Sequence, residues 1–431
     1  MATLIGAMSL TSCTKDVYNP EMDPVNRPAE NPWEDIAVPA GFNWSTIASV
    51  NLKVDVEDAY GGKYGYLIEA FPANPEEDPA AIPLAAGYAN LTQSYTTTLR
   101  MPQTVGNIYL RQTAPDGSQI VKTFAVQPQL DYTFAAAGSQ AATKSEPGTP
   151  EFPIEVGMDH NSKNNWAYTY AFEDLWPQYG DFDFNDVVVT IDKFHTSSYR
   201  ISIEGEVKAT GASRRIGVGI RFLNIKASDL EGVEAKLQST NGEAASVTFE
   251  KGQTDPVLII CEDVHAWCKN PKGEYPFINT ETDGGNKRTD CPDFRIWLNF
   301  KDKDVRDQAF DIMNMDVFAI TSTPTAVAGK RTEVHVAGFA PTDLGDTSRF
   351  GEANDASGQN GPYYLSKDNY AFGICIASEN KNHTHWQWPL EKVDIRTAYP
   401  DFTRWITSGG TESKDWTDHP ASGKVFGILK K

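Results

Sequence analysis

Oxygen-bearing side chains are concentrated in residues 180–189, GDFDFNDVVV. Asp181, Asp183 and Asn185 occupy alternate positions, and Asp186 follows them directly. On a strand this spacing places alternate side chains on one face, and in a calcium loop of the EF-hand type the same D-x-D-x-N spacing converges them on the ion. Carboxylates so close together repel one another, and a hard divalent cation relieves that repulsion. The stretch therefore predicts a structural calcium site.

The remaining ligands are expected from the segment just upstream, FEDLWPQYG. It contains Glu173 and Asp174, which a turn at Pro177 and Gly180 would bring back to the acidic stretch. The fit to an EF-hand is partial, because Asp186 stands at the sixth position, where that loop has glycine. The alternative is a turn in which Asp and Asn side chains accept hydrogen bonds from backbone N–H groups. Spacing alone leaves both interpretations open.

A strand that the fold buries is predicted directly after the acidic stretch. Residues 187–191, VVVTI, are apolar and β-branched. Phe182 and Phe184 alternate with the acidic residues, so we expect both rings to point toward the core. Further β-rich segments follow, among them YRISIEGEVKAT, RRIGVGIRFLNI and FRIWLNF, whereas helical patterns are scarce. Residues 156–431 are therefore predicted to form a large β-sandwich or jelly-roll-like domain with long loops and few short helices.

A smaller β domain is predicted over residues 36–130. SVNLKVDV alternates apolar and polar residues with period two, and similar strands recur at short intervals up to IVKTFAV. Strands at this spacing predict a small Ig-like β-sandwich, so the whole chain is expected to be all-β. Residues 135–153 are small, polar and interrupted by proline, and we predict a linker between the two domains over residues 131–155.

The N-terminus has the features of a lipid anchor. MATLIGAMSLTSC is an apolar run that ends in small residues and a cysteine, although the positively charged region that opens such signals is missing. Residues 10–13 have the form of a lipobox, in which the signal is cleaved before Cys13 and the thiol is acylated. We therefore expect a signal segment over residues 1–12, a polar tether over 13–35, and attachment to outer-membrane lipid through Cys13.

Charge and cysteine content restrict the partners and the chemistry. Asp and Glu number 58 against 38 Lys and Arg, and this net charge of −20 argues against nucleic acid as a partner. After the lipobox the cysteines are Cys261, Cys268, Cys291 and Cys375. An exported chain permits disulfides, and one pairing among the first three is possible, but spacing does not fix the connectivity. A zinc site is less favoured because no CxxC pair occurs.

Other candidate sites are weaker. NHTHWQWP places His383 and His385 two positions apart, a spacing that can ligate zinc, with His335 elsewhere in the chain. Trp386 and Trp388 of the same segment could stack on sugar rings if they were exposed. No G-x-S-x-G elbow, HExxH helix or phosphate-binding loop occurs. Paired carboxylates for glycoside hydrolysis need only spatial proximity, so a hydrolase stays the least favoured alternative.

The second half of the chain resembles a known family. AFEDLWPQYGDFDFNDVVVTIDKF, then VLIICEDVHAW, FRIWLNF, EVHVAGFAPTD and PYYLSKDNYAFGICI occur in this order. Together they are similar to the LruC-domain proteins, a family of bacterial surface or outer-membrane lipoproteins common in Bacteroidetes. The resemblance extends from about Trp166 to the C-terminus. It implies a calcium-associated acidic segment and no established enzymatic activity. The residues it implicates in calcium binding are Glu173, Asp174, Asp181, Asp183, Asn185 and Asp186.

These observations favour a lipid-anchored, calcium-stabilised protein of the outer membrane or cell surface. We expect it to be non-enzymatic, with a role in adhesion or envelope interaction and an unknown protein or glycan ligand. The alternative is a carbohydrate-binding component of a glycan-foraging system, and a glycosidase or peptidase is less favoured.

Overall fold

The structure is a computed structural model of the chain. Cys13, the signal segment, nearly all of the tether, most of the predicted linker, and His383 and His385 lie outside the residues that it describes. The described residues are 31–78, 80–135, 166–197, 199–237, 248–268, 277–281, 289–302, 305–306, 315–322, 325, 327–379 and 386–426.

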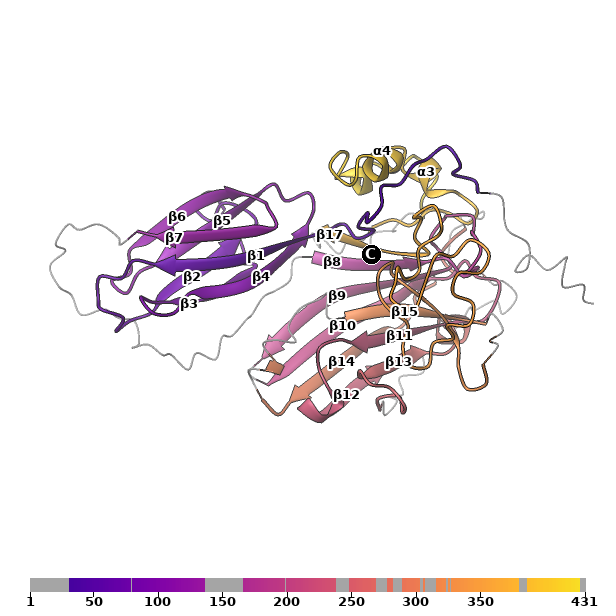
Figure 1. Cartoon of the computed structure of the whole chain (residues 1–431), viewed down its shortest axis with the longest axis horizontal. Coiled ribbons are helices and arrows are strands. Elements are labelled where there is room, and N and C mark those ends of the chain that lie inside the picture. Colours follow the sequence, from indigo (N-terminus) through magenta and orange to yellow (C-terminus); the bar gives the residue numbers. More distant parts are fainter. Residues whose placement is uncertain are drawn as a thin grey trace, which may run out of the picture.

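The chain is nearly all β, as the sequence predicted, and its first strands form a small sandwich (Figure 1). One sheet has the order β4-β1-β7 and consists of β4 (Tyr95–Pro102), β1 (Ile47–Val56) and β7 (Gln129–Phe134). The other has the order β3-β2-β5-β6 and consists of β3 (Ala85–Ala89), β2 (Tyr66–Phe71), β5 (Asn107–Thr113) and β6 (Gln119–Ala125). The alternating residues Val50, Leu52 and Val54 of β1 are buried between the sheets.

The second domain is a larger sandwich of a six-stranded and a four-stranded sheet. The six-stranded sheet runs, in order, through β12 (Leu230–Leu237), β14 (Asp293–Phe300), β10 (Arg200–Ala209), β9 (Val187–Ser197), β8 (Trp166–Phe172) and β17 (Gly373–Glu379). The four-stranded sheet runs through β13 (Val257–Cys261), β11 (Ile216–Phe222), β15 (Met315–Thr321) and β16 (Thr332–His335). The short helices are α1 (Val264–Cys268), α3 (Ile395–Ala398), α4 (Phe402–Thr407) and the 3-10 turns η2 (Ala227–Asp229) and η5 (Trp416–Asp418).

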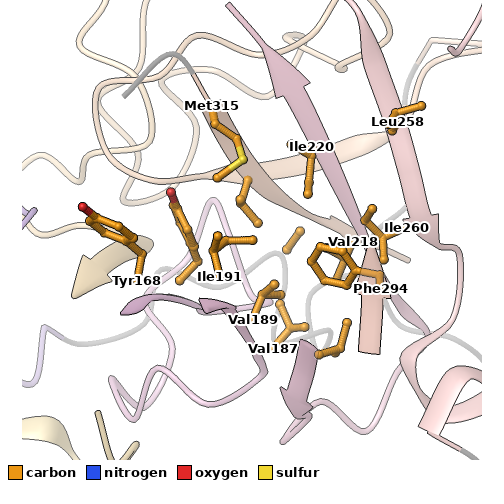
Figure 2. Packing of buried hydrophobic residues seen from close by; sticks show 14 of the residues in the cluster. Tyr168, Val187, Val189, Ile191, Val218, Ile220, Leu258, Ile260, Phe294 and Met315 are labelled. Carbon is orange, nitrogen blue, oxygen red and sulfur yellow. The ribbon is translucent and has the colours of Figure 1, made fainter. Parts of the chain in front are cut away.

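The main core fills the space between these two sheets (Figure 2). Val187, Val189 and Ile191 of β9 point into it, because alternate residues of a strand share one face. They belong to the same cluster as apolar side chains of the four-stranded sheet, such as Val218 and Ile220. Each of these side chains is almost fully removed from water, which stabilises the fold by about 1.5–3 kcal/mol per large apolar residue.

A second core covers the opposite face of the six-stranded sheet. Val188 of β9 and Ile374 and Ile376 of β17 point into it. It is closed by residues 386–426, which carry α3, α4 and η5 and which we call the C-terminal cap (Figure 1). The sheet is thus buried on both faces where β8, β17 and the start of β9 lie, which explains why consecutive residues at the start of β9 are all apolar rather than alternating.

The N-terminal residues 33–44 also belong to the second core, which corrects the predicted domain boundary at residue 36. Trp33 is fully buried, stacks on Phe182 at 4.1 Å between ring centroids, and donates from Nε1 to Asp394 Oδ2 at 2.7 Å. Figure 1 places this indigo segment beside α3 and α4. The small sandwich begins only at Ile47, so the chain enters the large domain first.

The predicted start of the linker at residue 131 is wrong as well. Residues 131–134 are the second half of β7, which pairs in parallel with β1 as far as Val56 opposite Phe134. Leu130 and Phe134 are buried in the small sandwich. Apolar and polar residues alternate in LDYTF, as in a strand with one buried face. This pattern predicts the structure of residues 131–134 better than the run of small residues that follows them.

A disulfide joins Cys268, at the end of α1, to Cys291, just before β14. This confirms that one pair forms among Cys261, Cys268 and Cys291. Cys261 and Cys375 are free and buried. None of the helices in the described parts of the chain is long and apolar enough to cross a membrane.

Candidate metal centre

The acidic residues predicted from the sequence lie in one loop, residues 173–186, which we call the acidic loop. It connects the neighbouring antiparallel strands β8 and β9, whose ends Phe172 and Val187 pair with each other. The two ends of the loop are therefore held side by side, at the same end of two hydrogen-bonded strands. At its start, the Glu173 N–H donates to the carbonyl oxygen of Phe372 at 2.9 Å.

The loop is curled and is not an extension of the strand. Phe182 and Phe184 have positive φ angles of 56° and 48°, in the left-handed region that non-glycine residues rarely occupy. Both rings are buried in the second core, as predicted. Of the two backbone geometries considered, the strand is wrong, because β9 begins only at Val187.

The curl brings three carboxylates together. One oxygen each of Glu173, Asp181 and Asp183 lies within 4.8 Å of the other two. Gly180 makes room for this arrangement, because a Cβ at that position would stand 1.7 Å from Glu173 Oε2. Asp181 is exposed, whereas Glu173 and Asp183 are buried. The group is thus a partly open pocket of hard oxygen donors, the ligand type that calcium prefers.

The same carboxylates also accept hydrogen bonds from the backbone. Glu173 accepts from Phe184 N–H at 2.8 Å and from Phe182 N–H at 3.3 Å. Asp183 accepts from Asn185 N–H at 3.1 Å and from Lys392 N–H at 2.7 Å. The alternative prediction, a turn whose acidic side chains accept backbone hydrogen bonds, is therefore confirmed. It does not exclude a cation, since each carboxylate oxygen has a second lone pair.

Asp174 and Asp186 form the other side of the loop. The Asp174 N–H donates to Asp186 Oδ2 at 2.7 Å, and the Thr210 hydroxyl donates to the backbone oxygen of Asp186 at 2.8 Å. Asn185 is fully buried, and its Nδ2 donates to the backbone oxygen of Pro389 at 3.2 Å. All predicted ligand residues are thus brought to one loop, but only Glu173, Asp181 and Asp183 converge as a close group.

Burial, and after it the repulsion between neighbouring carboxylates, shifts several pKa values in this loop upward. Burial raises the pKa of Glu173 well above its ordinary value, and Asp181 and Asp183 add to the effect. Burial and then the charge of Asp181 raise the pKa of Asp183 to about 8. Burial, reinforced by Asp174, also raises the pKa of Asp186 well above its ordinary value. Without a cation the loop therefore holds protons at a pH where exposed carboxyls are ionised.

Two basic side chains oppose this repulsion. Arg214 lowers the pKa of Asp174, but burial outweighs it, and the pKa stays above its ordinary value. Lys392 likewise lowers the pKa of Asp181, but the partial loss of hydration that this carboxyl undergoes beside its buried neighbours raises the pKa by more, although the residue as a whole is exposed. The negative charge of the loop is therefore only partly compensated, and its donor set fits a hard divalent cation such as calcium.

Glu391, which the sequence analysis did not single out, lies next to this loop. Burial and the charge of Asp181 raise its pKa to about 7. It comes from the C-terminal cap, far from the acidic loop in sequence, and the segment WPLEKVD shows no ligand spacing of its own. Only the fold could reveal this neighbour.

The proposed sugar-binding tryptophans are wrongly assigned. Trp386 and Trp388 are each only 3 % exposed and belong to the second core. Trp386 stacks on Tyr399 at 5.8 Å, and Trp388 stacks on Phe426 at 5.6 Å between ring centroids. The Trp388 indole donates to the backbone oxygen of Asn279 at 2.7 Å. These rings hold the cap onto the sheet, so they offer no face to a sugar.

His335 has no role in a zinc site with an open position. Its ring is fully buried, with Nδ1 2.9 Å from Asp316 Oδ2 and Nε2 3.1 Å from Glu333 Oε2. An ionised carboxylate can only accept, so both ring nitrogens donate and the imidazole is protonated. In agreement, the two carboxylates raise the pKa of His335 although burial, the largest effect, lowers it. The residue is part of a buried ion-pair network.

Comparison with known proteins gives a family and a fold. Residues 198–416 match the model of a domain of unknown function, DUF4842. The acidic loop lies just before this stretch. The fold is similar to the crystal structure of a protein described as a putative lipoprotein from Bacteroides ovatus, at 17% sequence identity and a TM-score of 0.52. That similarity covers 85% of this chain and 99% of the other.

No curated protein matches the chain. The family assignment therefore rests on the matched stretch, which is just over half of the 431 residues and contains most of the large sandwich and its cap. The chain belongs to the DUF4842 family.

Proposed function

We propose that this protein is a lipid-anchored bacterial surface protein whose acidic loop binds calcium as a structural ion. The observation that carries the proposal is the convergence of Glu173, Asp181 and Asp183 within 4.8 Å in a loop whose negative charge is only partly compensated. Calcium would supply the missing positive charge. Asp174, Asn185 and Asp186 are the further oxygen donors of the same loop.

The residues of the loop would act on the fold and not on a substrate. Glu173 follows the end of β8, while Asp181 and Asp183 precede the start of β9. A cation held by all three therefore fixes the curl of the loop and the point where β9 begins. Its binding also offsets the mutual repulsion that otherwise opposes folding of this segment.

The surface location rests on the N-terminal sequence and on the two resemblances. Residues 10–13 have the lipobox pattern, and the chain resembles LruC-domain lipoproteins. The structurally similar protein from Bacteroides ovatus is itself described as a putative lipoprotein. Together these favour a protein held at the outer membrane or cell surface through acylated Cys13, with a non-enzymatic role in adhesion or envelope interaction.

Thermal unfolding with and without calcium tests the structural ion. Metal-stripped protein should gain about 2.7 kcal/mol of stability at a calcium concentration of roughly 100 times Kd. This corresponds to a rise in Tm of roughly 5–10 °C. Asp183→Asn and Glu173→Gln should lose most of the rise, because each removes one charged ligand from the loop.

Asp131→Asn is the matched control, since this exposed carboxylate lies in β7 of the small sandwich and should leave the calcium response unchanged. A wild-type protein with the same Tm in calcium and in chelator would disprove the proposed calcium role.

A further inference from the structure

Two oxygen atoms beside Gly211 are buried and have no hydrogen-bond partner among the residues that the structure describes. They are Asn185 Oδ1 and Glu391 Oε2. Asn185 is 0 % exposed, and its Nδ2 is already used in the bond to Pro389. A buried acceptor without a donor costs about 1–3 kcal/mol, and more when it is charged. Leaving two such atoms unsatisfied would be expensive for the fold.

The two oxygens face each other across a space that only glycine leaves open. A Cβ on Gly211 would stand 1.8 Å from Asn185 Oδ1 and 2.6 Å from Glu391 Oε2. The two atoms can therefore be no farther apart than the sum of these distances. When Glu391 is ionised, neither oxygen can donate a hydrogen bond, and a cation between them would satisfy both.

This space adjoins the acidic loop. Asn185 is a residue of the loop, and the residue after Glu391 donates its backbone N–H to Asp183 at 2.7 Å. Asp181 is the charged group that most strongly affects Glu391. The orphan oxygens therefore lie where the acidic loop, which contains Asn185, meets the C-terminal cap, which contains Glu391.

We infer that Glu391 is a ligand of the loop's cation, together with the side-chain oxygen of Asn185, and that the bound ion fastens the C-terminal cap to the sandwich. This inference rests on the proposed calcium binding and adds a ligand from a segment that the acidic motif does not contain. The cation would then link the acidic loop to the C-terminal cap, because each of them would supply ligands.

Calcium affinity of single variants tests the ligand assignment. Glu391→Gln keeps the shape of the side chain but removes its charge, and we expect calcium Kd to rise about tenfold or more. Gly211→Ala changes no charge, yet its methyl group would displace both oxygens, so we expect a rise of similar size. Isothermal titration calorimetry of the metal-stripped full chain measures both, and circular dichroism checks that each variant is folded.

Glu281→Gln is the matched control. Glu281 is exposed and close enough to Glu391 to raise its pKa. Because the substitution removes the same charge from the same neighbourhood without touching the orphan oxygens, Kd should change by less than about threefold.

Hydrogen exchange of the cap tests the fastening. In the wild type, saturating calcium should slow exchange of the amides in α3 and α4, which lie in the cap. In Glu391→Gln, calcium at a concentration that saturates the variant should slow them much less, since the ion no longer contacts the cap.

The outcomes separate the two proposals. Should wild type bind calcium and Asp183→Asn lose it, while Glu391→Gln and Gly211→Ala bind as tightly as wild type, the ligand assignment is overturned and the calcium loop stands. Absence of calcium binding in the wild type overturns both. If Gly211→Ala does not fold, the calcium Kd of Glu391→Gln is compared with that of Glu281→Gln. A similar Kd for the two variants then overturns the ligand assignment.

Discussion

At the scale of residues, the acidic loop combines two roles that the sequence presented as alternatives. Glu173 and Asp183 accept backbone hydrogen bonds that shape the curl, and the same curl turns their remaining lone pairs toward Asp181. Capping and ion binding therefore reinforce each other, because the hydrogen bonds hold the carboxylates in position before the ion arrives.

The raised pKa values give a pH dependence with a definite sign. A carboxyl whose pKa is higher in the folded than in the unfolded protein binds more protons when folded. Its contribution to stability is present below the unfolded value, about 4, and is lost as pH rises through the folded value. For Asp183 the folded pKa is about 8, so the ion-free protein should lose stability between these limits.

Protons and calcium compete for the same oxygens, so the increase in Tm caused by calcium should be larger at pH 8 than at pH 5.5. Metal-stripped protein in chelator-free buffer, with and without added calcium, gives this difference at each pH. The Asp183→Asn variant should show a weaker pH dependence of it. Equal calcium effects at both pH values in the wild type would contradict the assigned role of these carboxyls.

At the scale of elements, the sequence predicted correctly what local pattern determines. The β-branched run after the acidic stretch did become a buried strand, and Phe182 and Phe184 did turn inward. The C-terminal cap was missed, because Trp386 and Trp388 look the same in a sequence whether they are exposed or buried. Glu391 could not be found, since only the packing of the cap on the sheet brings it beside Asn185.

The disulfide is the element-scale feature with the clearest energetic consequence. Cys268 and Cys291 are separated by 23 residues, and closing a loop of that length stabilises the folded state by about 3 kcal/mol in the chain-entropy model. The double variant Cys268→Ala/Cys291→Ala should lose about this much free energy of unfolding, measured by denaturant titration.

A reductant separates this effect from changes in packing. It should lower the stability of the wild type and leave the double variant unaffected, since the free thiols of Cys261 and Cys375 are present in both. A wild type that is insensitive to reductant under unfolding conditions would show that the bond contributes nothing.

At the scale of the whole molecule, the large domain is formed by two separate parts of the chain, one before and one after the small sandwich. Residues 33–44 pack in the second core of the large sandwich, the small sandwich follows, and the chain then returns to β8. The Tyr370 hydroxyl oxygen lies 2.6 Å from the backbone oxygen of Trp33 and 2.8 Å from that of Ile36, and these two acceptors share its single hydrogen. The small sandwich is thus an insertion into the large domain.

Trp33 should therefore stabilise a domain from which it is distant in sequence. Trp33→Ala removes a fully buried indole and should cost about 3–5 kcal/mol of stability in the large domain. Trp33→Phe keeps a ring against Phe182 but loses the bond to Asp394, so its cost should be clearly smaller. Thermal unfolding followed by near-ultraviolet circular dichroism measures both, and an unchanged Tm in Trp33→Ala would contradict this role.

The insertion also decides how the molecule would bear a mechanical load. If the chain is held through Cys13, tension reaches the folded part near Trp33 and passes straight into the core of the large domain. Two more hydrogen bonds attach the chain to the large domain before β1 begins. The Trp44 indole N–H donates to the backbone oxygen of Asn369, and the Thr46 backbone N–H donates to that of Cys375 in β17. A pull between the anchor and the large domain would therefore bypass the small sandwich, whose strands would carry none of the tension.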